Sequence, residues 1–237
     1  MLIDFRTPRA AVLCSKRAPG IDYILRHPDF GTMYDVACVV TTEESLPEAA
    51  VIEDAGVALL HHRPRAFRVR PEFDAITAET LQELDVDVVV LLGYLYILTE
   101  PMLQAFPGRI LNVHDSDLTL LGSDGRRRYR GLHSTRDAIL AGERETRSTL
   151  HVVTAEVDAG PVLAVSEPFE VAPLVQDALA LGSLDMIRAY SYAHREWMMR
   201  RAWGPMVVAE LEKLAWSAAV PAAGREASRL AGGAVAV

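Results

Sequence analysis

The sequence has few cysteines and no long apolar run, and each shortage excludes a class of protein. Its two cysteines, Cys14 and Cys38, lie in apolar, strand-like stretches and are expected to be buried thiols rather than a disulfide framework. No apolar stretch has the length of a membrane span, and the N-terminus lacks a signal-peptide pattern. We therefore expect a cytoplasmic protein with no membrane partner.

The sequence is also short of positive charge. Its formal net charge is −8 at pH 7, from 24 basic and 32 acidic residues. Because sequence-independent binding to nucleic acid needs a positive field, no nucleic-acid partner is expected. The Gly-x-Gly-x-x-Gly turn of dinucleotide-dependent oxidoreductases and the Gly-x-Ser-x-Gly elbow of serine hydrolases are both missing. These absences argue against two enzyme classes that use a similar alternation of strands and helices.

The first half of the chain alternates apolar, β-rich stretches with helical patterns. Such alternation predicts βαβ units, and hence an α/β fold with a Rossmann-like, mostly parallel sheet and helices on both faces. Residues 87–92 are almost continuously apolar, as expected for a central strand that is covered on both sides. The expected strands are 10–14, 35–41, 57–60, 86–92 and 109–114, and the expected helices are 21–26, 46–55 and 72–84.

The second half is predicted to add an antiparallel strand pair to this sheet. A helix over 133–140 precedes strands at 149–154 and 162–169, which are joined by a turn at 158–161. The stretch 174–216 is helical in character, with breaks expected at Gly182 and at Gly204-Pro205. We expect residues 1–216 to form one catalytic domain and the Ala/Gly-rich residues 217–237 to be a disordered tail.

Three polar residues stand out as candidates for catalysis. Asn112 and His114 end an apolar strand, and because side chains alternate along a strand, both point to the same face. Asp158 lies on the turn before Gly160 and Pro161, where its carboxylate is available to orient or charge the imidazole. An amide, an imidazole and a carboxylate are the groups that acyl transfer to an amine requires.

These residues resemble the motifs of the folate-dependent formyltransferases, most closely the branch that acts on glycinamide ribonucleotide. That family carries Asn-x-His at a strand end and Thr-x-Glu-x-Asp-x-Gly-Pro about forty residues later, and here these are 112–114 and 154–161. Further similarities are found at 91–98, at Gly131-Leu132-His133-Ser134, and at Arg70 before Phe73-Asp74. The resemblance extends from about Val36 to Phe169 and more loosely to Leu214.

The resemblance implies direct attack of an amine on the formyl carbon of 10-formyltetrahydrofolate, with no metal and no covalent enzyme intermediate. Asn112 and protonated His114 would donate hydrogen bonds to the oxyanion, while Asp158 would keep His114 protonated and relay a proton through water. The acceptor would be a small-molecule amine, and the protein a monomer or homodimer. The residues implied in binding the folate are Arg70, at its tail, and Leu95, Tyr96, Ile97, Leu98, Thr154, Ala155, Glu156 and Val157, around its pterin.

The acceptor half of the family pattern is altered. The family's Gly-x-Gly-Ser-Asn phosphate loop after the first strand is replaced by 14–20, Cys-Ser-Lys-Arg-Ala-Pro-Gly, and the Gln-Glu-His group before a late proline by Met199-Arg200-Arg201. We therefore expect an acceptor other than glycinamide ribonucleotide. Two alternatives stay open: formylation of glycinamide ribonucleotide itself, and hydrolysis of 10-formyltetrahydrofolate. Hydrolases of this kind usually carry an additional N-terminal domain, for which residues 1–9 leave no room.

An Arg-rich loop at 119–130 also departs from the family pattern. The family has a short Pro-rich connection there, whereas this chain carries additional glycines and arginines. One interpretation is a solvated surface insertion. The other is a loop that binds an acidic group of the acceptor through Arg126, Arg127 or Arg128. Both interpretations stay open.

Overall fold

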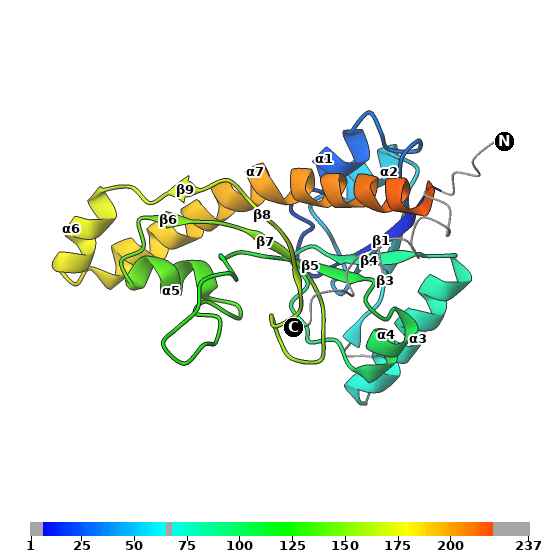
Figure 1. Cartoon of the computed structure of the whole chain (residues 1–237). Helices are drawn as coiled ribbons and strands as arrows, with labels where there is room; N and C mark the ends of the chain where they lie inside the picture. The colour runs from blue at the N-terminus through cyan, green and yellow to red at the C-terminus, as the bar shows by residue number, and fades with distance from the viewer. Residues whose placement is uncertain (1–6, 65–67, 220–237) are drawn as a thin grey trace, which may run out of the picture.

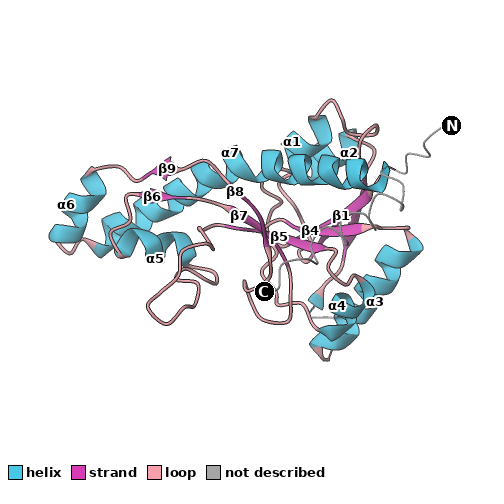
Figure 2. Cartoon of the chain, in the orientation of Figure 1, coloured by secondary structure: helices cyan, strands magenta, loops and turns pink. Residues whose placement is uncertain are grey.

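A seven-stranded sheet forms the centre of the molecule, in a computed structural model that describes residues 7–64 and 68–219 (Figures 1 and 2). The five parallel strands are followed at one edge by an antiparallel pair, so the predicted fold class is confirmed. In spatial order the strands are β3 (Ala58–His61), β2 (Asp35–Thr41), β1 (Arg9–Cys14), β4 (Val88–Leu91), β5 (Ile110–His114), β7 (Thr149–Val152) and β8 (Val162–Val165).

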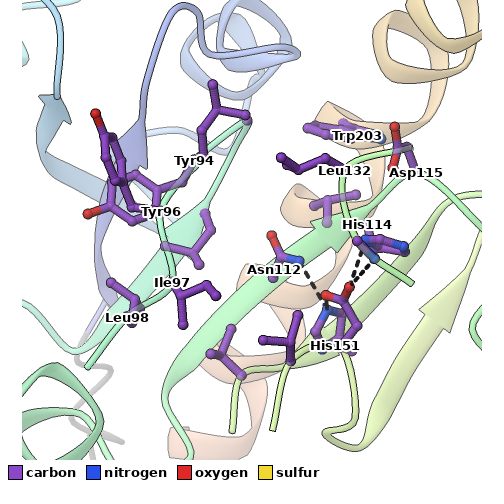
Figure 3. A pocket seen from close by; sticks show the side chains of 18 of the residues that line it. Tyr94, Tyr96, Ile97, Leu98, Asn112, His114, Asp115, Leu132, His151 and Trp203 are labelled. Atoms are coloured by element: carbon purple, nitrogen blue, oxygen red, sulfur yellow. Dashed lines mark hydrogen bonds and ion pairs between the residues drawn. The ribbon is translucent and has the colours of Figure 1, made fainter. Parts of the chain in front are cut away.

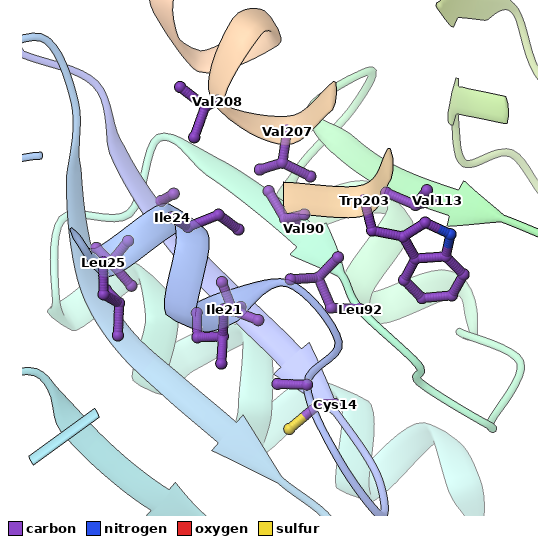
Figure 4. Packing of buried hydrophobic residues seen from close by; sticks show 14 of the residues in the cluster. Cys14, Ile21, Ile24, Leu25, Val90, Leu92, Val113, Trp203, Val207 and Val208 are labelled. Atoms are coloured by element: carbon purple, nitrogen blue, oxygen red, sulfur yellow. The ribbon is translucent and has the colours of Figure 1, made fainter. Parts of the chain in front are cut away.

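Helices cover both faces of this sheet. On one face, α1 (Ile21–Arg26), α2 (Ala49–Asp54) and the long α7 (Leu184–Ala219) pack on the larger apolar cluster (Figure 4). On the other face lie α3 (Arg70–Glu83) and α4 (Glu100–Ala105), with a smaller cluster of their own. The alternating burial of β1 explains this division, since Ala10, Val12 and Cys14 belong to the first cluster and Ala11 and Leu13 to the second.

The N-terminal half of α7 extends beyond the sheet, as Figure 1 shows. There it packs with α5 (Ser134–Leu140), α6 (Leu174–Ala180) and a small second sheet of β6 (Glu145–Thr146) and β9 (Phe169–Glu170). The patterns in the sequence did not predict β6 as a strand or α4 as a helix. The strand expected over 162–169 is divided into β8 and β9, with Pro168 between them.

The predicted helix break at Gly182 is confirmed, but the break at Gly204-Pro205 is wrong. Helix α7 continues through Pro205. Packing outweighs the missing amide because the neighbouring Trp203, Val207 and Val208 are all buried in the main core. Gly204 lies so close to α1 that a Cβ there would be 2.7 Å from the Cβ of Tyr23. The same helix includes Ser217–Ala219 of the predicted tail, and the rest of that tail lies outside the described residues.

The strand order places a crevice at one end of the sheet. The chain proceeds from β1 outward to β2 and β3, and then returns to β4 on the other side of β1. In open α/β sheets, ligands bind outside the carboxyl ends of the strands beside such a reversal. Within the described residues, no helix is both long enough and apolar enough to cross a membrane.

Candidate active site

A cavity of about 300 Å³ opens beyond the carboxyl ends of β4 and β5 (Figure 3). One wall is mostly apolar and comes from the segment after β4, while polar side chains of β5 and β7 face it from the other side. The residues that line it are Leu91, Gly93, Tyr94, Leu95, Tyr96, Ile97, Leu98, Asn112, Val113, His114, Asp115, Gly131, Leu132, His151, Val153, Thr154, Val157, Asp158, Arg195 and Trp203. The structure therefore brings Asn112, His114 and Asp158 to one cavity.

Asn112 is held by a histidine that the sequence patterns did not single out. In the antiparallel pairing of β5 with β7, His151 lies directly opposite Asn112, and the Nδ2 of Asn112 is 3.0 Å from the Nε2 of His151. The other ring nitrogen, Nδ1, lies 3.0 Å from the carbonyl oxygen of Val152, which can only accept a hydrogen bond. Nδ1 therefore carries the proton, Nε2 accepts from the amide, and the second N–H of Asn112 is left for the cavity.

His114 is oriented by one backbone carbonyl and one carboxylate. Its Nε2 lies 3.1 Å from the carbonyl oxygen of Tyr129, so Nε2 donates. Its Nδ1 lies 3.6 Å from the Oδ2 of Asp158, which is an ion-pair distance but longer than a hydrogen bond. Because Nε2 is already committed to Tyr129, Nδ1 is the nitrogen available to a reacting group.

Asp158 is positioned by its own backbone conformation. Its φ is 53°, in the left-handed region that few residues other than glycine adopt, and such strain concentrates at functional sites. The Gly131 amide donates to Oδ2 at 2.8 Å, and Oδ1 lies 3.7 Å from the Nε2 of His151. The carboxylate thus lies between the two imidazoles, with its side chain 9% exposed.

The Arg-rich loop has a role that neither interpretation of the sequence anticipated. Arg127 reaches across to the loop of Asp158, where its guanidinium donates to the carbonyl oxygens of Asp158 at 2.6 Å and Gly160 at 2.8 Å. Arg128 pairs with Glu143, and Arg126 is exposed. The loop is therefore a clamp on the backbone that carries the candidate catalytic carboxylate, and its Arg126, Arg127 and Arg128 do not line the cavity.

We expect Arg127→Gln to lower kcat about tenfold, because displacing a reacting group by about 1 Å can cost up to 10²-fold. The change removes two charged donors from the Asp158 loop and leaves Asp158 itself in place. Steady-state kinetics would measure the loss, with Arg126→Gln at the exposed neighbour as the matched control. Equal rates for the two variants would rule out the clamp.

His151 should make the stability of the protein depend on pH. Burial lowers the pKa of this imidazole, despite the hydrogen bond to Val152 and the charge of Asp158 that act in the opposite direction. The folded state thus binds the proton less readily than the unfolded chain, whose histidines titrate near about 6.5. Stability from this group is complete above that pH and is lost as the pH falls below it.

We therefore expect the free energy of unfolding to decrease as the pH falls below the ordinary histidine value of about 6.5. Urea titrations at several pH values would measure this slope. Burial also lowers the pKa of His194 and His62, so part of the slope should remain in a His151→Asn variant. A slope as steep in His151→Asn as in the wild type would contradict the assignment.

The residues predicted to bind the folate fall into two groups. Leu95, Tyr96, Ile97, Leu98, Thr154 and Val157 line the cavity, whereas Arg70, Ala155 and Glu156 do not. Arg70 lies behind the wall, where its guanidinium is 4.5 Å from the ring centre of Tyr96 and pairs with the buried Asp74 at 3.2 Å. Its Nε and Nη1 are buried without a hydrogen-bond partner among the described residues.

The expected exchange at Met199-Arg200-Arg201 does not reach the cavity. Met199 is buried in the main core, and Arg200 and Arg201 are exposed. The α7 residues that do line the cavity are Arg195 and Trp203, which lie four residues before Met199 and four residues after it. The helical periodicity of α7 indicates that residues 195, 199 and 203 lie on neighbouring turns. Which side of the helix faces the cavity is set only by packing against the sheet.

A group of possible metal ligands lies elsewhere. Ligand-type atoms of His27, Asp29 and Glu212 lie within 4.8 Å of one another, and none of the three lines the cavity. Burial and the carboxylate of Asp29 raise the pKa of Glu212, as expected of two acidic groups close together. Nothing else there indicates an ion, so we assign no metal to it.

Comparison with known proteins adds a family to this geometry. Residues 8–178 match the family described as "Formyl transferase". The chain is 31% identical over 156 residues to phosphoribosylglycinamide formyltransferase of Haemophilus influenzae, a match that covers 65% of this chain and 70% of that protein. It is 28% identical over 156 residues to formyltetrahydrofolate deformylase of Bacillus subtilis, covering 65% of this chain and 48% of the relative.

A solved structure shows the same fold. Glycinamide ribonucleotide transformylase 1 from Symbiobacterium toebii superimposes with a TM-score of 0.63 and 31% sequence identity, over 84% of this chain and 88% of the other. Some relatives are much longer than the matching region. The chain spans only 12% of a trifunctional purine biosynthetic protein of Drosophila melanogaster, to which it is 28% identical over 165 residues.

Proposed function

This chain belongs to the formyl transferase family, and we propose that it transfers the formyl group of 10-formyltetrahydrofolate to a primary amine of a small molecule. The observation that carries the proposal is the convergence of Asn112, His114 and Asp158 on one cavity, with an apolar wall opposite. The family match and the deformylase relative, whose name includes formyltetrahydrofolate, support the donor.

The proposed chemistry uses the hydrogen-bonding groups of Asn112 and His114 that have no hydrogen-bond partner among the described residues. Attack of the amine on the formyl carbon places negative charge on the former carbonyl oxygen. The second N–H of Asn112 and the Nδ1–H of protonated His114 are the donors in the cavity that we assign to this oxygen. One preorganised donor of this kind lowers the barrier by about 3 kcal/mol. His151 fixes the amide of Asn112, so the first donor needs little reorganisation when charge develops.

Asp158 completes the reaction by moving a proton. The attacking nitrogen must lose a proton and the departing folate nitrogen must gain one, so the reaction is balanced when one group carries the proton between them. The carboxylate of Asp158, through water, is the proposed carrier, and its negative charge also stabilises the imidazolium of His114 at 3.6 Å. The formyl C–N bond to the folate breaks as the new amide bond to the acceptor is retained.

The folate would bind along the wall after β4. Leu95 and Ile97 are exposed apolar side chains in this segment, an arrangement that is costly in water and useful against a flat ring. Backbone groups of 95–98 and of the loop 154–157 are the proposed partners of the pterin. Arg70, which is paired with Asp74 behind this wall, would support it through the rings of Tyr94 and Tyr96.

The acceptor is the open part of the proposal. The relative from Haemophilus influenzae supports glycinamide ribonucleotide as the second candidate. The deformylase relative supports water as a third, because the same three residues would stabilise the same intermediate. The altered segment 15–20 favours an amine other than glycinamide ribonucleotide.

One assay distinguishes these candidates. The purified protein is given 10-formyltetrahydrofolate alone, with glycinamide ribonucleotide, or with a panel of other small amines, and the release of tetrahydrofolate is followed by absorbance. Release that requires an amine supports a transferase, and release without one supports a hydrolase. No release in any mixture, together with no binding of 10-formyltetrahydrofolate in calorimetry, would overturn the proposed function.

A further inference from the structure

The segment between β1 and α1 borders the cavity at the end occupied by α7. Gly93, which lines the cavity, packs so closely against this segment that a Cβ would be 3.1 Å from the carbonyl oxygen of Arg17 and 3.2 Å from Cδ of Pro19. From α7, Arg195 and Trp203 line the same end, and Figure 3 shows Trp203 and Asp115 near His114 and away from Leu98. An acceptor bound at His114 would therefore lie near these groups.

Two groups of this segment that could bind a phosphate, the Arg17 guanidinium and the Ala18 amide, are already bound to carboxylates. Both Nη atoms of Arg17 donate to the carboxylate of Glu196, as a bidentate pair. The backbone amide of Ala18 donates to Glu48 at 3.2 Å. A phosphate here would have to displace one carboxylate and approach another, and like charges repel at such distances.

The segment also leaves little room for an anion beside α7. A Cβ on Gly20, whose φ is +85°, would be 2.5 Å from the backbone nitrogen of Gly204. This direct contact between two glycines closes the space between the segment and the helix. Lys16 is exposed and has no ion-pair partner among the described residues, so its affinity for phosphate must be measured directly.

Arg195, in contrast, has donors to spare. Its Nε donates to the Oδ2 of Asp115, whose Oδ1 accepts from the hydroxyl of Ser134 at 2.7 Å. Neither Nη atom of Arg195 has a hydrogen-bond partner in the part of the chain that the structure describes, and its side chain is 28% exposed at the cavity. Arg195, Asp115 and His114 all line the same cavity, so the guanidinium is fixed in the cavity that holds the imidazole. A fixed planar pair of N–H groups suits carboxylate, carbonyl or phosphate oxygens, so the exclusion of a phosphate depends on the segment 15–20.

We propose that Arg195 binds the acceptor, and that this acceptor is a phosphate-free amine with a carboxylate or carbonyl oxygen close to its reacting nitrogen. This inference rests on the proposed function and names the class of amine at that same site. Arg195 is the specificity-determining residue, and Asp115 is the residue that positions it. The pairs Arg17–Glu196 and Ala18–Glu48 exclude the phosphate.

The first test uses inorganic phosphate as a probe and needs no knowledge of the acceptor. Phosphate should change neither the melting temperature of the wild-type protein nor its rate of formyl transfer, relative to chloride at equal ionic strength. Glu196→Gln, which releases Arg17, should gain phosphate-dependent stabilisation, while Glu72→Gln at an exposed site on α3 should not. Stabilisation or competitive inhibition of the wild type by phosphate would overturn the exclusion of phosphate, whether it acts through Lys16 or Arg17.

The second test compares acceptors that differ by one group. Glycinamide ribonucleotide and glycinamide riboside share the same amine and carbonyl, and we expect the riboside to be the better acceptor. Glycine and glycinamide then distinguish a carboxylate from a carbonyl oxygen. A tenfold preference for the ribonucleotide would overturn the proposal, and so would an absence of both turnover and binding for all four amines.

The third test addresses Arg195 itself. Arg195→Gln should raise the KM for the acceptor about tenfold, which corresponds to loss of a charged hydrogen bond. The KM for the formyl donor should be unchanged, Arg195→Lys should recover part of the loss, and Arg188→Gln at an exposed position of the same helix should behave as wild type. An unchanged KM for the acceptor in Arg195→Gln would overturn its role. Failure of the proposed function can be distinguished from failure of this inference, because the protein would then not bind 10-formyltetrahydrofolate.

Discussion

Replacing Asp158 with asparagine should lower kcat by about 10²- to 10⁴-fold, the usual contribution of a positioned proton carrier. The amide keeps the shape of the side chain, and its oxygen can still accept from the amide of Gly131. It has no negative charge, however, so it neither stabilises the imidazolium of His114 nor carries a proton to the folate nitrogen. The KM for the formyl donor should change little, because the proposed mechanism places Asp158 at the reacting atoms rather than at the apolar wall.

The measurement is single-turnover kinetics with saturating folate and amine, which separates the chemical step from product release. Asp117→Asn is the matched control, since that carboxylate is also partly buried but pairs with Arg147 outside the cavity. A double-mutant cycle with His114→Asn should be strongly non-additive, because the charge of Asp158 stabilises the imidazolium with which His114 binds the oxyanion. Additive losses, or a rate within a few-fold of the wild type, would show that Asp158 is only a turn residue.

The features that the sequence predicts well are those that depend on local pattern. Residues 35–41 and 21–26 were predicted as an element each, and the structure has β2 and α1 with the same bounds. Alternation along 110–114 was sufficient to predict that Asn112 and His114 share a face, because a strand has only two. The turn after β7 carries Asp158 to the same cavity, which the order of motifs in the family implied.

The features that the sequence does not predict depend on contacts between distant segments. His151 differs from any other histidine near a strand end only because antiparallel register places it opposite Asn112. Arg127 became a clamp because its loop folds back onto 158–160, some thirty residues further along the chain. No local pattern distinguishes an arginine that binds a backbone carbonyl from an arginine that is solvated.

Helix α7 shows that a clear local pattern can also give a wrong prediction. A proline normally ends a helix, so Gly204-Pro205 predicted a break on sound local grounds. The helix continues because Gly204 permits contact with Gly20 and Tyr23 of α1, and because the flanking apolar residues are buried. The continuous helix holds Trp203 at the cavity and Val207 in the core. The proline is unfavourable locally, but the unbroken helix that contains it positions a residue of the site.

Replacing Gly160 with alanine should destabilise the protein by about 3 kcal/mol, at the upper end of what overpacking usually costs. A Cβ at this position would overlap the carbonyl oxygen of Val152 and lie 3.1 Å from Cγ2 of Thr154. Both neighbours belong to residues 152–154, directly before this loop, so the overlap can be relieved only by movement of the backbone. For a chain of this length the melting temperature should fall by about 6 to 12 °C.

The same substitution should also lower kcat by at least about tenfold, because small displacements of reacting groups are costly. The carbonyl oxygen of Val152 accepts from the Nδ1 of His151, whose Nε2 in turn accepts from Asn112. The carbonyl oxygen of Gly160 accepts from Arg127, which also binds the backbone of Asp158. Movement of this one glycine should therefore disturb both Asn112, the proposed oxyanion donor, and Asp158, the proposed proton carrier.

Gly182→Ala distinguishes this effect from ordinary backbone strain. Gly182 has a φ of +66°, no atom would lie within 4 Å of its Cβ, and it lies between α6 and α7 rather than at the cavity. It should cost about 1 to 2 kcal/mol, the usual cost of the left-handed conformation in a residue with a side chain, and leave kcat unchanged. If Gly160→Ala lost stability but kept the wild-type kcat, the loop would tolerate displacement and the coupling between Gly160, His151 and Asp158 would be disproved.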